Sequence, residues 1–392
     1  MKNLKFIALS FVSGIFIVPS LTFAMSNLPI SGVFPDTINL KTDCSNLSNC
    51  ATTIVEIQTW IDTYKRPSTT TRLLVNVGPG IFKGGFICNG WSNLSFKGAG
   101  PDESVFAINI PGPAMEGRSC NQFNVQDMSF TKTGAADAIA PVSWNGTGSS
   151  TWTNVHIEPV FSYGWTEFNC PADPALAPVH RWFNSRIQGK IKGYTALCSK
   201  NWFFGSQIEA KPSSDITDPT FNAINVLGEP ATARPEVHLY GSNISVILPT
   251  GMSVPPAGVI GFAGSIQGVN VISATNNATV HVHGTGIDII GNDMPNVVAA
   301  LAATTGGFIH ADQAAFNLTT APGGSVIRIF NQGGHVHSPY LWPGHDTPPA
   351  ITSITGADTA FVTNTPDGHP HMIVYDSACG SKWYDTATKV CQ

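Results

Sequence analysis

A short pattern recurs along the middle of this chain and constrains its fold more than any other feature. The segments read FNVQDMSF from residue 123, WTNVHIEP from 152, WFNSRIQG from 182, FFGSQIEA from 203 and LYGSNISV from 239. Each combines an aromatic or apolar residue, one or two small polar residues and then Ile or Met. Their spacing varies between about 20 and 36 residues, which is typical of stacked coils with loops of different lengths. Stacking would bury the inward side chains of all coils in one shared column.

One helix precedes the repeats. Apolar residues recur at helical spacing over 51–65, at Ile54, Ile57, Trp60, Ile61 and Tyr64, and Pro67 ends the pattern. The sequence therefore predicts an all-β domain over 25–294, a right-handed parallel β-helix, with this helix as an N-terminal cap over the exposed end of the column. A β-sandwich is the alternative, but two-residue Asn-Gly turns are scarce.

The repeats fade after about Gly291. Residues 295–392 contain Pro-rich loops and a segment bounded by cysteines. We expect this part to form a C-terminal β-rich extension, separate from the repeats.

The first 24 residues have the features of a secretory signal peptide. Lys2 and Lys5 precede an apolar run over 6–18, and Ala24 is a suitable residue for cleavage. A membrane anchor is the alternative, but the run is shorter than the roughly 20 residues that a spanning helix needs. We expect a secreted or periplasmic protein, and no membrane span after cleavage.

Eight cysteines follow this segment, an even number that suits disulfides in an oxidising compartment. We expect pairs between neighbours in sequence, although sequence alone leaves other pairings open: Cys44–Cys50, Cys88–Cys120, Cys170–Cys198 and Cys379–Cys391. No CxxC motif occurs, which argues against a thiolate zinc site.

Charged residues make up only 11% of the chain, and the net charge is −5. A usual charged fraction is about 25%. No basic stripe occurs, which argues against nucleic acid as a partner. We expect a monomer without a cofactor.

Three segments resemble pectin methylesterases. Residues 57–100 resemble the opening of that family, 181–210 resemble its two successive rungs, and 226–244 resemble its Leu-Gly-Arg-Pro-Trp segment. The resemblance covers about residues 50–250 and implies a pectin lyase-like β-helix. It also implies a site with two aspartates and an arginine acting on methyl esters.

The catalytic residues of that family are replaced in this chain. The resemblance places the nucleophile at Lys192, the acid/base aspartate near Ser162, the arginine at Glu229 and a substrate-stacking tryptophan at Ala231. Residues 182–206 contain no Asp or Glu, so a small shift of the alignment does not restore the nucleophile. Lys192 and Glu229 either form a reversed ion pair across the former cleft or are two unrelated loop charges.

Other carboxylates are scattered. The densest groups are Asp215 with Asp218, and Asp288 with Asp293. Both are more typical of turns than of catalytic sites.

Histidines form a competing signal. His-x-His pairs occur at His281 and His283, at His335 and His337, and at His369 and His371, with His345 and Asp346 close by in sequence. Because residues two apart in a strand point to one face, such a pair can bind a divalent metal. His281, His283, His335 and His337 are the candidate ligands, and exposed polar residues on a solvated face are the alternative.

Aromatic residues within the repeats suggest sugar binding. Trp165, Trp182, Tyr194 and Trp202 are the candidates, since sugar rings stack on aromatic faces. The alternative is that they form an aromatic core. Two function classes follow. The first is a secreted, non-catalytic protein that binds a polysaccharide or a cell-surface glycan. The second is a carbohydrate-active enzyme, such as a divergent pectinesterase or another polysaccharide esterase, lyase or hydrolase.

Overall fold

A computed structural model describes most of the chain between Thr37 and Cys391. The gaps are residues 46, 48, 65–71, 110, 134–139, 172, 213–219, 230–232, 250–258, 261–265, 291–297, 313, 320–325, 333–334, 344–349, 354–358, 365–369, 376–382 and 386–389. All described residues belong to one compact unit, 36–392. The predicted signal peptide lies outside the described residues.

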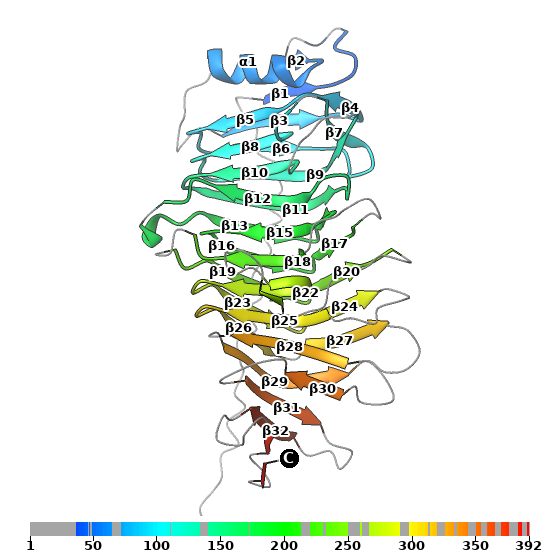
Figure 1. Cartoon of the computed structure of the whole chain (residues 1–392). Coiled ribbons are helices and arrows are strands. Elements are labelled where there is room, and N and C mark those ends of the chain that lie inside the picture. The colour runs from blue at the N-terminus through cyan, green and yellow to red at the C-terminus, as the bar shows by residue number, and fades with distance from the viewer. Residues whose placement is uncertain are drawn as a thin grey trace, which may run out of the picture. The chain divides into compact units, whose positions relative to one another are not determined.

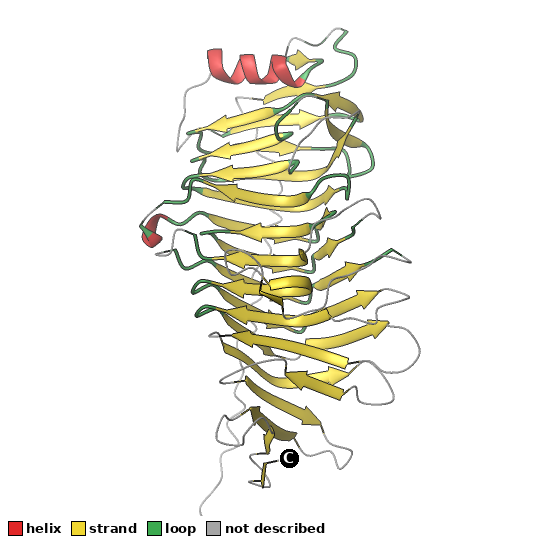
Figure 2. Ribbon diagram, in the orientation of Figure 1, coloured by secondary structure: helices red, strands yellow, loops and turns green. Residues whose placement is uncertain are grey.

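Parallel strands, one coil after another, form nearly all of this unit (Figures 1 and 2). Each full coil contributes strands to two legs of sheet A and one strand to sheet B. The first leg of sheet A contains β3 (Leu73–Val77), β6 (Leu94–Lys97), β13 (Val179–Phe183), β16 (Lys200–Phe204), β19 (Glu236–Tyr240), β23 (Thr279–His283), β26 (Phe308–Asp312), β29 (His335–Pro343) and β31 (Thr359–Asn364).

The second leg of sheet A contains β4 (Gly80–Lys83), β7 (Ser104–Ile108), β14 (Arg186–Gly189), β17 (Gln207–Ala210), β20 (Asn243–Ile247), β24 (Gly286–Ile290) and β27 (Ala314–Thr319). Three longer strands, β9 (Phe123–Lys132), β11 (Ser149–Ile157) and β29, pair with strands of both legs. β1 (Thr37–Leu40) pairs with β2 (Cys50–Ala51) and with β3.

Sheet B contains β5 (Phe86–Asn89), β8 (Met115–Arg118), β10 (Val142–Asn145), β12 (Tyr163–Phe168), β15 (Lys192–Ala196), β18 (Thr220–Leu227), β22 (Ile266–Thr275), β25 (Val298–Thr304), β28 (Val326–Gln332) and β30 (Ala350–Ser353). The short β21 (Val259–Ile260) pairs antiparallel with β22, and a 3-10 turn covers Pro174–Leu176. The predicted parallel β-helix is confirmed by these pairings, and parallel crossovers are almost always right-handed.

The recurring sequence pattern is the bend between the two legs. Four successive coils each place one residue at positive φ there, namely Asn184 (48°), Gly205 (57°), Gly241 (54°) and Gly284 (53°). A buried hydroxyl follows, from Ser185, Ser206, Ser242 or Thr285, and donates to the carbonyl two residues earlier at 3.0, 3.3, 3.3 and 3.0 Å. Because Gly and Asn tolerate the left-handed conformation and a short hydroxyl satisfies the carbonyl, the same small residues recur in these four coils.

Inward side chains form the shared core. Trp182, Phe203, Leu239 and Val282 lie in register on four successive coils of the first leg and are fully buried. An isoleucine column, Ile157, Ile187, Ile208, Ile244 and Ile287, does the same on the second leg. The column of apolar residues holds the coils together.

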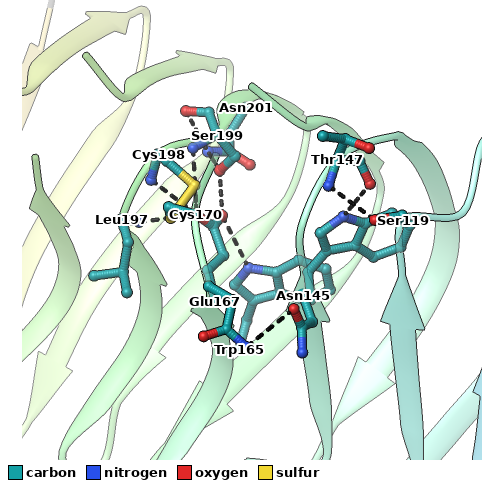
Figure 3. Close-up of a disulfide and its surroundings, with 12 residues drawn as sticks. Ser119, Asn145, Thr147, Trp165, Glu167, Cys170, Leu197, Cys198, Ser199 and Asn201 are labelled. Atoms are coloured by element: carbon teal, nitrogen blue, oxygen red, sulfur yellow. Dashed lines mark hydrogen bonds between the residues drawn. A yellow bond between two sulfur atoms is a disulfide. The ribbon is translucent and has the colours of Figure 1, made fainter. Parts of the chain in front are cut away.

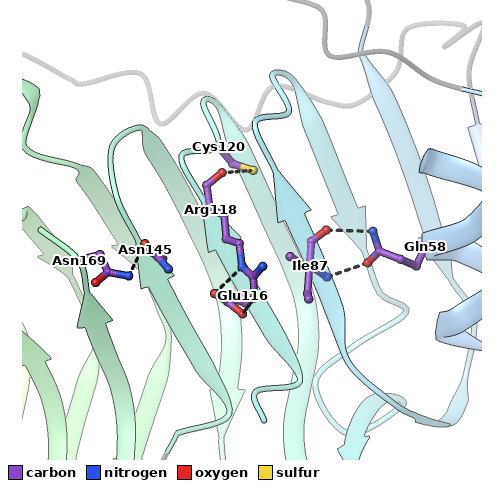
Figure 4. A network of polar contacts seen from close by, with 7 residues as sticks. All are labelled: Gln58, Ile87, Glu116, Arg118, Cys120, Asn145 and Asn169. Carbon is purple, nitrogen blue, oxygen red and sulfur yellow. Dashed lines mark hydrogen bonds and ion pairs between the residues drawn. The ribbon is translucent and has the colours of Figure 1, made fainter. Parts of the chain in front are cut away.

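The predicted helix is α1 (Ile54–Tyr64), and Ile54, Ile57 and Ile61 belong to the buried core. The Gln58 side chain bonds Ile87 of β5 on both sides (Figure 4), accepting from its N–H at 2.8 Å and donating to its C=O at 3.1 Å. Gln58 thus satisfies the backbone of β5 as a neighbouring strand would. This contact supports the capping role of the helix, which stays a prediction.

The predicted boundary at residue 294 is wrong. β25, β26, β27 and β28 pair in parallel with the coils before them, so the column continues without a break past that residue. Antiparallel pairing begins only where β31 meets β32 (Pro370–Tyr375), followed by β33 (Trp383–Asp385) and β34 (Val390–Cys391). The repeat signal had faded because the segment between β26 and β27 lacks the Gly or Asn followed by Ser or Thr that marks the earlier bends.

Three predicted disulfides are confirmed: Cys44–Cys50, Cys88–Cys120 and Cys170–Cys198. Cys379 lies outside the described residues, so its bond to Cys391 stays a prediction. Within the described part of the chain, no helix is long and apolar enough to cross a bilayer.

Candidate functional site

A column of aromatic rings lies on the outer face of the first leg of sheet A. Phe183, Phe204, Tyr240 and His283 occupy the last position of β13, β16, β19 and β23, in register. Their ring centroids are 5.1, 5.1 and 5.0 Å apart, and successive planes differ by only 8°, 9° and 13°. All four side chains are partly exposed. The coil spacing of about 4.8 Å sets this stacking distance.

A second column runs beside the first, two residues earlier in each strand. Trp202 stacks on His238 at 5.5 Å, and His238 stacks on His281 at 4.6 Å. The guanidinium of Arg181 lies 5.7 Å from the centre of the Trp202 ring. The outer strip, as we call the two columns together, consists of Phe183, Phe204, Tyr240, His283, Trp202, His238 and His281.

The rings of the outer strip present their edges to solvent, because their faces stack on one another along the column. Aromatic edges carry partial positive charge, and Tyr240 adds a hydroxyl while Trp202 adds an indole N–H. Imidazole nitrogens add donors and acceptors. The strip therefore offers a regular array of edges and polar groups that fits oxygen atoms better than apolar surfaces.

Three histidines of the strip form a cluster. His238, His281 and His283 each place a ring nitrogen within 4.8 Å of the others. Burial, followed by the charge of His281, lowers the pKa of His238 to about 4. Burial likewise lowers the pKa of His281, with further contributions from His310 and His283.

The metal candidates predicted from sequence are thus partly brought together. His281 and His283 share the cluster with His238, which sequence reasoning missed because it lacks a His-x-His partner. His335 and His337 begin β29, whose backbone pairs His337 with His310 and His335 with Phe308. Their side chains, and residues 345, 346 and 369, lie outside the described part of the structure, as does the side chain of His371.

Three of the four predicted sugar-stacking residues are wrong. Trp165, Trp182 and Tyr194 are fully buried inside the coils, where Tyr194 stacks on Trp165 and Trp182 meets both rings edge to face. Only Trp202 lies on the outer face. The physical reason is the alternation of a strand, because Trp202 pairs with Arg181 and not with Trp182.

Lys192 and Glu229 do not form the reversed ion pair. Lys192 begins β15 and pairs with Asn222, while the N–H of Glu229 bonds the carbonyl of Leu197 beyond the other end of β15. Five residues of strand between Lys192 and Leu197 correspond to roughly 16 Å. The Lys192 ammonium lies 5.3 Å from the ring of Tyr163 instead.

Ser162 lies next to Lys192 on the preceding coil, where its carbonyl accepts from the Lys192 N–H at 3.1 Å. Ala231 lies outside the described residues. The outward positions of sheet B beside this region are filled by Thr166, Thr195 and Asn225. An esterase site with a carboxylate nucleophile needs ionisable carboxylates. At these three positions of sheet B the side chains are hydroxyls and an amide instead.

A second polar site lies on the outer face of the second leg. Glu209 is almost fully buried there and accepts from Gln188, from Gln207 at 2.6 Å and from Arg186 at 3.3 Å. Asp288 lies two coils further along the same column, with Ser245 between them. Burial raises the pKa of Asp288. Asp288 belongs to β24, so its interpretation as a turn residue is wrong, whereas Asp215, Asp218 and Asp293 lie outside the described residues.

A buried carboxylate stabilises the turn beside the Cys170–Cys198 disulfide (Figure 3). Glu167 accepts from the N–H groups of Leu197 and Cys198 at 2.9 and 3.0 Å, and also from the Ser199 hydroxyl. Burial raises its pKa. Glu167 lies close to both sulfurs, but these are bonded to each other and so are not available to a metal.

The outer strip was present in the sequence as a signal. In WFNS, FFGS, LYGS and HVHG, the residue before the bend is aromatic or histidine, and it always follows an inward residue. If the repeats are aligned on the bend residue, the alternation of side chains along each strand places these rings on the outer face.

Comparisons with known proteins give a likeness of architecture. No family model and no curated protein matches this chain. Among solved structures, it is similar to the pectin methylesterase PemA from Erwinia chrysanthemi, with 9% identity, a TM-score of 0.42, and 83% of this chain and 94% of that chain covered.

Two viral proteins give similar values. The tailspike protein gp49 from Acinetobacter baumannii bacteriophage Fri1, a capsular polysaccharide depolymerase, is 11% identical with a TM-score of 0.44, covering 87% of this chain and 70% of that chain. The ORF18 protein of Geobacillus virus E2 is 12% identical with a TM-score of 0.46, and the match covers 88% of this chain and 68% of that chain. At these identities, none of the three transfers its activity to this chain.

Proposed function

We propose that this protein binds a polysaccharide or glycan through the outer strip and does not hydrolyse it. The observation that carries the proposal is the register of the strip. Flat rings repeat at one coil spacing over β13, β16, β19 and β23, and two of the four, Tyr240 and His283, carry polar groups. A repeating array of this kind matches a repeating ligand.

The chemistry of the strip favours a hydroxyl-rich ligand. Ring edges and imidazole or indole N–H groups attract oxygen atoms, and Tyr240 both donates and accepts. Lys200 and Glu236 lie beside the strip and form an ion pair at 3.5 Å. Sugar hydroxyls can bond to both members, so binding leaves neither charge without a partner.

The residues at the former esterase positions support a non-catalytic protein. A carboxylate nucleophile requires Asp or Glu, and Lys192 stands there with its ammonium beside Tyr163. The three disulfides support a secreted or periplasmic location, because such bonds persist in oxidising compartments.

A glycan screen with matched variants tests the proposal. Tyr240→Ala and Trp202→Ala should each weaken binding about tenfold or more, which corresponds to about 1.4 kcal/mol. Phe168→Ala is the control, because Phe168 is an exposed aromatic residue in sheet B, away from the strip. Equal affinity for all four proteins, or no glycan bound by the wild type, would refute the proposal.

A second candidate function is glycoside hydrolysis by Glu209 and Asp288. Two coil spacings put their Cα atoms about 10 Å apart. Inverting hydrolases hold an ionised and a protonated carboxyl group about 6.5–9.5 Å apart. Against this role, Glu209 is 2% exposed and its oxygens already accept several hydrogen bonds.

Reducing-end release from the glycans that bind decides between the two functions. We expect none from the wild type. Release that is lost in both Glu209→Gln and Asp288→Asn, while glycan binding is kept, would establish the hydrolase instead.

A further inference from the structure

The histidine cluster of the outer strip points to a second kind of ligand. We propose that His238, His281 and His283 bind one divalent transition-metal ion of the zinc type. The ion would occupy ring nitrogens that the outer strip otherwise offers to a sugar, but its binding needs only the three histidines and can be measured without a glycan.

The three histidines are close enough to reach one metal ion once their rings turn toward it. The three ring nitrogens lie within 4.8 Å of one another. Zinc–nitrogen bonds of about 2.1 Å put two nitrogens of a tetrahedral site about 3.4 Å apart. The ring planes are within 8° of parallel, so the rings must turn about their two side-chain bonds before the nitrogens converge. The three side chains are only partly buried, so this turn can also close the remaining gap of up to about 1.4 Å without movement of the strands.

The backbone holds the three residues in place. His238 and His281 are directly paired between β19 and β23, and His281 and His283 lie two apart on the same face of β23. The neighbouring pairs Val237–Val280 and Leu239–Val282 are buried in the core. The cluster therefore sits on rigid strands, which reduces the entropy that a metal site loses on binding.

One ring nitrogen of the cluster lacks a partner. Nδ1 of His238 is buried, and no donor or acceptor in the described part of the chain reaches it. A ligating imidazole usually donates its second nitrogen to a carboxylate or carbonyl group. Within the described residues, Nδ1 of His238 makes no such hydrogen bond. No contact there therefore holds the ring in a tautomer that would prevent metal binding.

Ligand type sets the class of ion. Glu236 lies two residues before His238 on the same face of β19, where it is paired with Lys200 at 3.5 Å. Three imidazoles suit zinc, nickel and copper, whereas calcium and magnesium require oxygen ligands. His310 pairs with His281 on the next coil, with ring centroids 5.9 Å apart, and is placed to be a fourth ligand.

Zinc titration of the purified protein without a histidine tag tests the proposal. Isothermal titration with zinc chloride should give one site per chain, and calcium chloride should give none. Cobalt chloride should produce the visible absorption of a tetrahedral ion. His281→Asn should weaken zinc binding at least about 100-fold. Loss of a group that only hydrogen-bonds to a metal ligand weakens metal binding by about 10- to 100-fold.

His156→Asn is the matched control. His156 is a partly exposed histidine on β11, one leg away from the cluster and three coils before β19 in the strand pairing. The His156→Asn variant should bind zinc with the same affinity as the wild type. Melting temperatures of both variants without metal show that each is folded. The absence of a zinc site in the wild type, or equal zinc affinity in the wild type and His281→Asn, overturns the proposal whether or not any glycan binds.

Discussion

Phe204 and Tyr240 stack face to face on the outside of the protein, with ring centroids 5.1 Å apart and planes 9° apart. The pair joins two coils through side chains, in addition to the backbone bonds of β16 and β19. The outer strip therefore contributes to stability as well as to the proposed binding.

Tyr240→Ala should lower the free energy of unfolding by about 1–3 kcal/mol, because it removes two ring contacts and part of a buried surface. Tyr240→Phe should have an effect below about 0.5 kcal/mol, since the ring remains. Urea unfolding measures both. If the two variants are equally stable, the stacking between coils contributes nothing.

Close packing inside the column gives a second prediction. A Cβ on Gly117 would lie 2.3 Å from two ring atoms of Trp144, which pairs with it across sheet B. Gly117→Ala should therefore destabilise the protein by about 1–3 kcal/mol. Gly286→Ala is the control, because its Cβ would approach no atom closer than 3.5 Å. Similar melting temperatures for the two variants would show that the space beside Trp144 is not tightly filled.

Much of the fold could be predicted from the sequence, because stacked coils repeat the same bend. The helix over 54–64, the parallel coils and three disulfides follow from local spacing. The end of the column did not follow, because a coil built from small residues such as Ala302 and Ala303 stacks as well as an aromatic one but carries a weaker sequence signal.

A buried histidine makes the protein sensitive to acid. Burial lowers the pKa of His180 to about 3, below its ordinary value of 6.5. His180 lies in the core, with Nδ1 2.7 Å from the Ser150 hydroxyl and its ring edge-on to Trp144 and Trp165. The unfolded chain takes up the proton first, so the stability due to neutral His180 is complete above pH 6.5 and is lost as the pH falls towards 3.

His180→Gln should reduce the slope of unfolding free energy against pH between 6 and 4 by up to about 1.4 kcal/mol per pH unit. Urea unfolding from pH 8 to pH 4 measures the slope. At pH 8 the two proteins differ only by packing, because His180 is neutral in both states. Parallel curves over the whole range would contradict the buried neutral histidine.

The distance between Lys192 and Glu229 gives a fourth prediction. Because the two side chains stand at opposite ends of the sheet B strands, their effects on stability should be additive within about 0.5 kcal/mol. Lys192→Met should cost about 0.5–1 kcal/mol through the lost contact with Tyr163. A double-mutant cycle with Glu229→Gln measures the coupling, and a coupling above about 1 kcal/mol would place the two charges together.

The site was harder to predict from sequence than the fold. A tryptophan inside a repeat indicates a coil but not the face on which its side chain lies. One residue of register separates the buried Trp182 from the partly exposed Trp202 on the outer face. The histidine cluster combines residues from two coils that are 43 positions apart, from His238 to His281. Only the strand pairing shows that they meet.

A crystal structure with a bound oligosaccharide tests the central claim most directly. The ligand should be the shortest fragment of the glycan that binds in the screen. The account predicts sugar hydroxyls in hydrogen-bond contact with side chains of the outer strip over β16, β19 and β23, Tyr240 among them. A sugar bound on the outer face of sheet B, beside Thr166 and Thr195, or between Glu209 and Asp288, would contradict it.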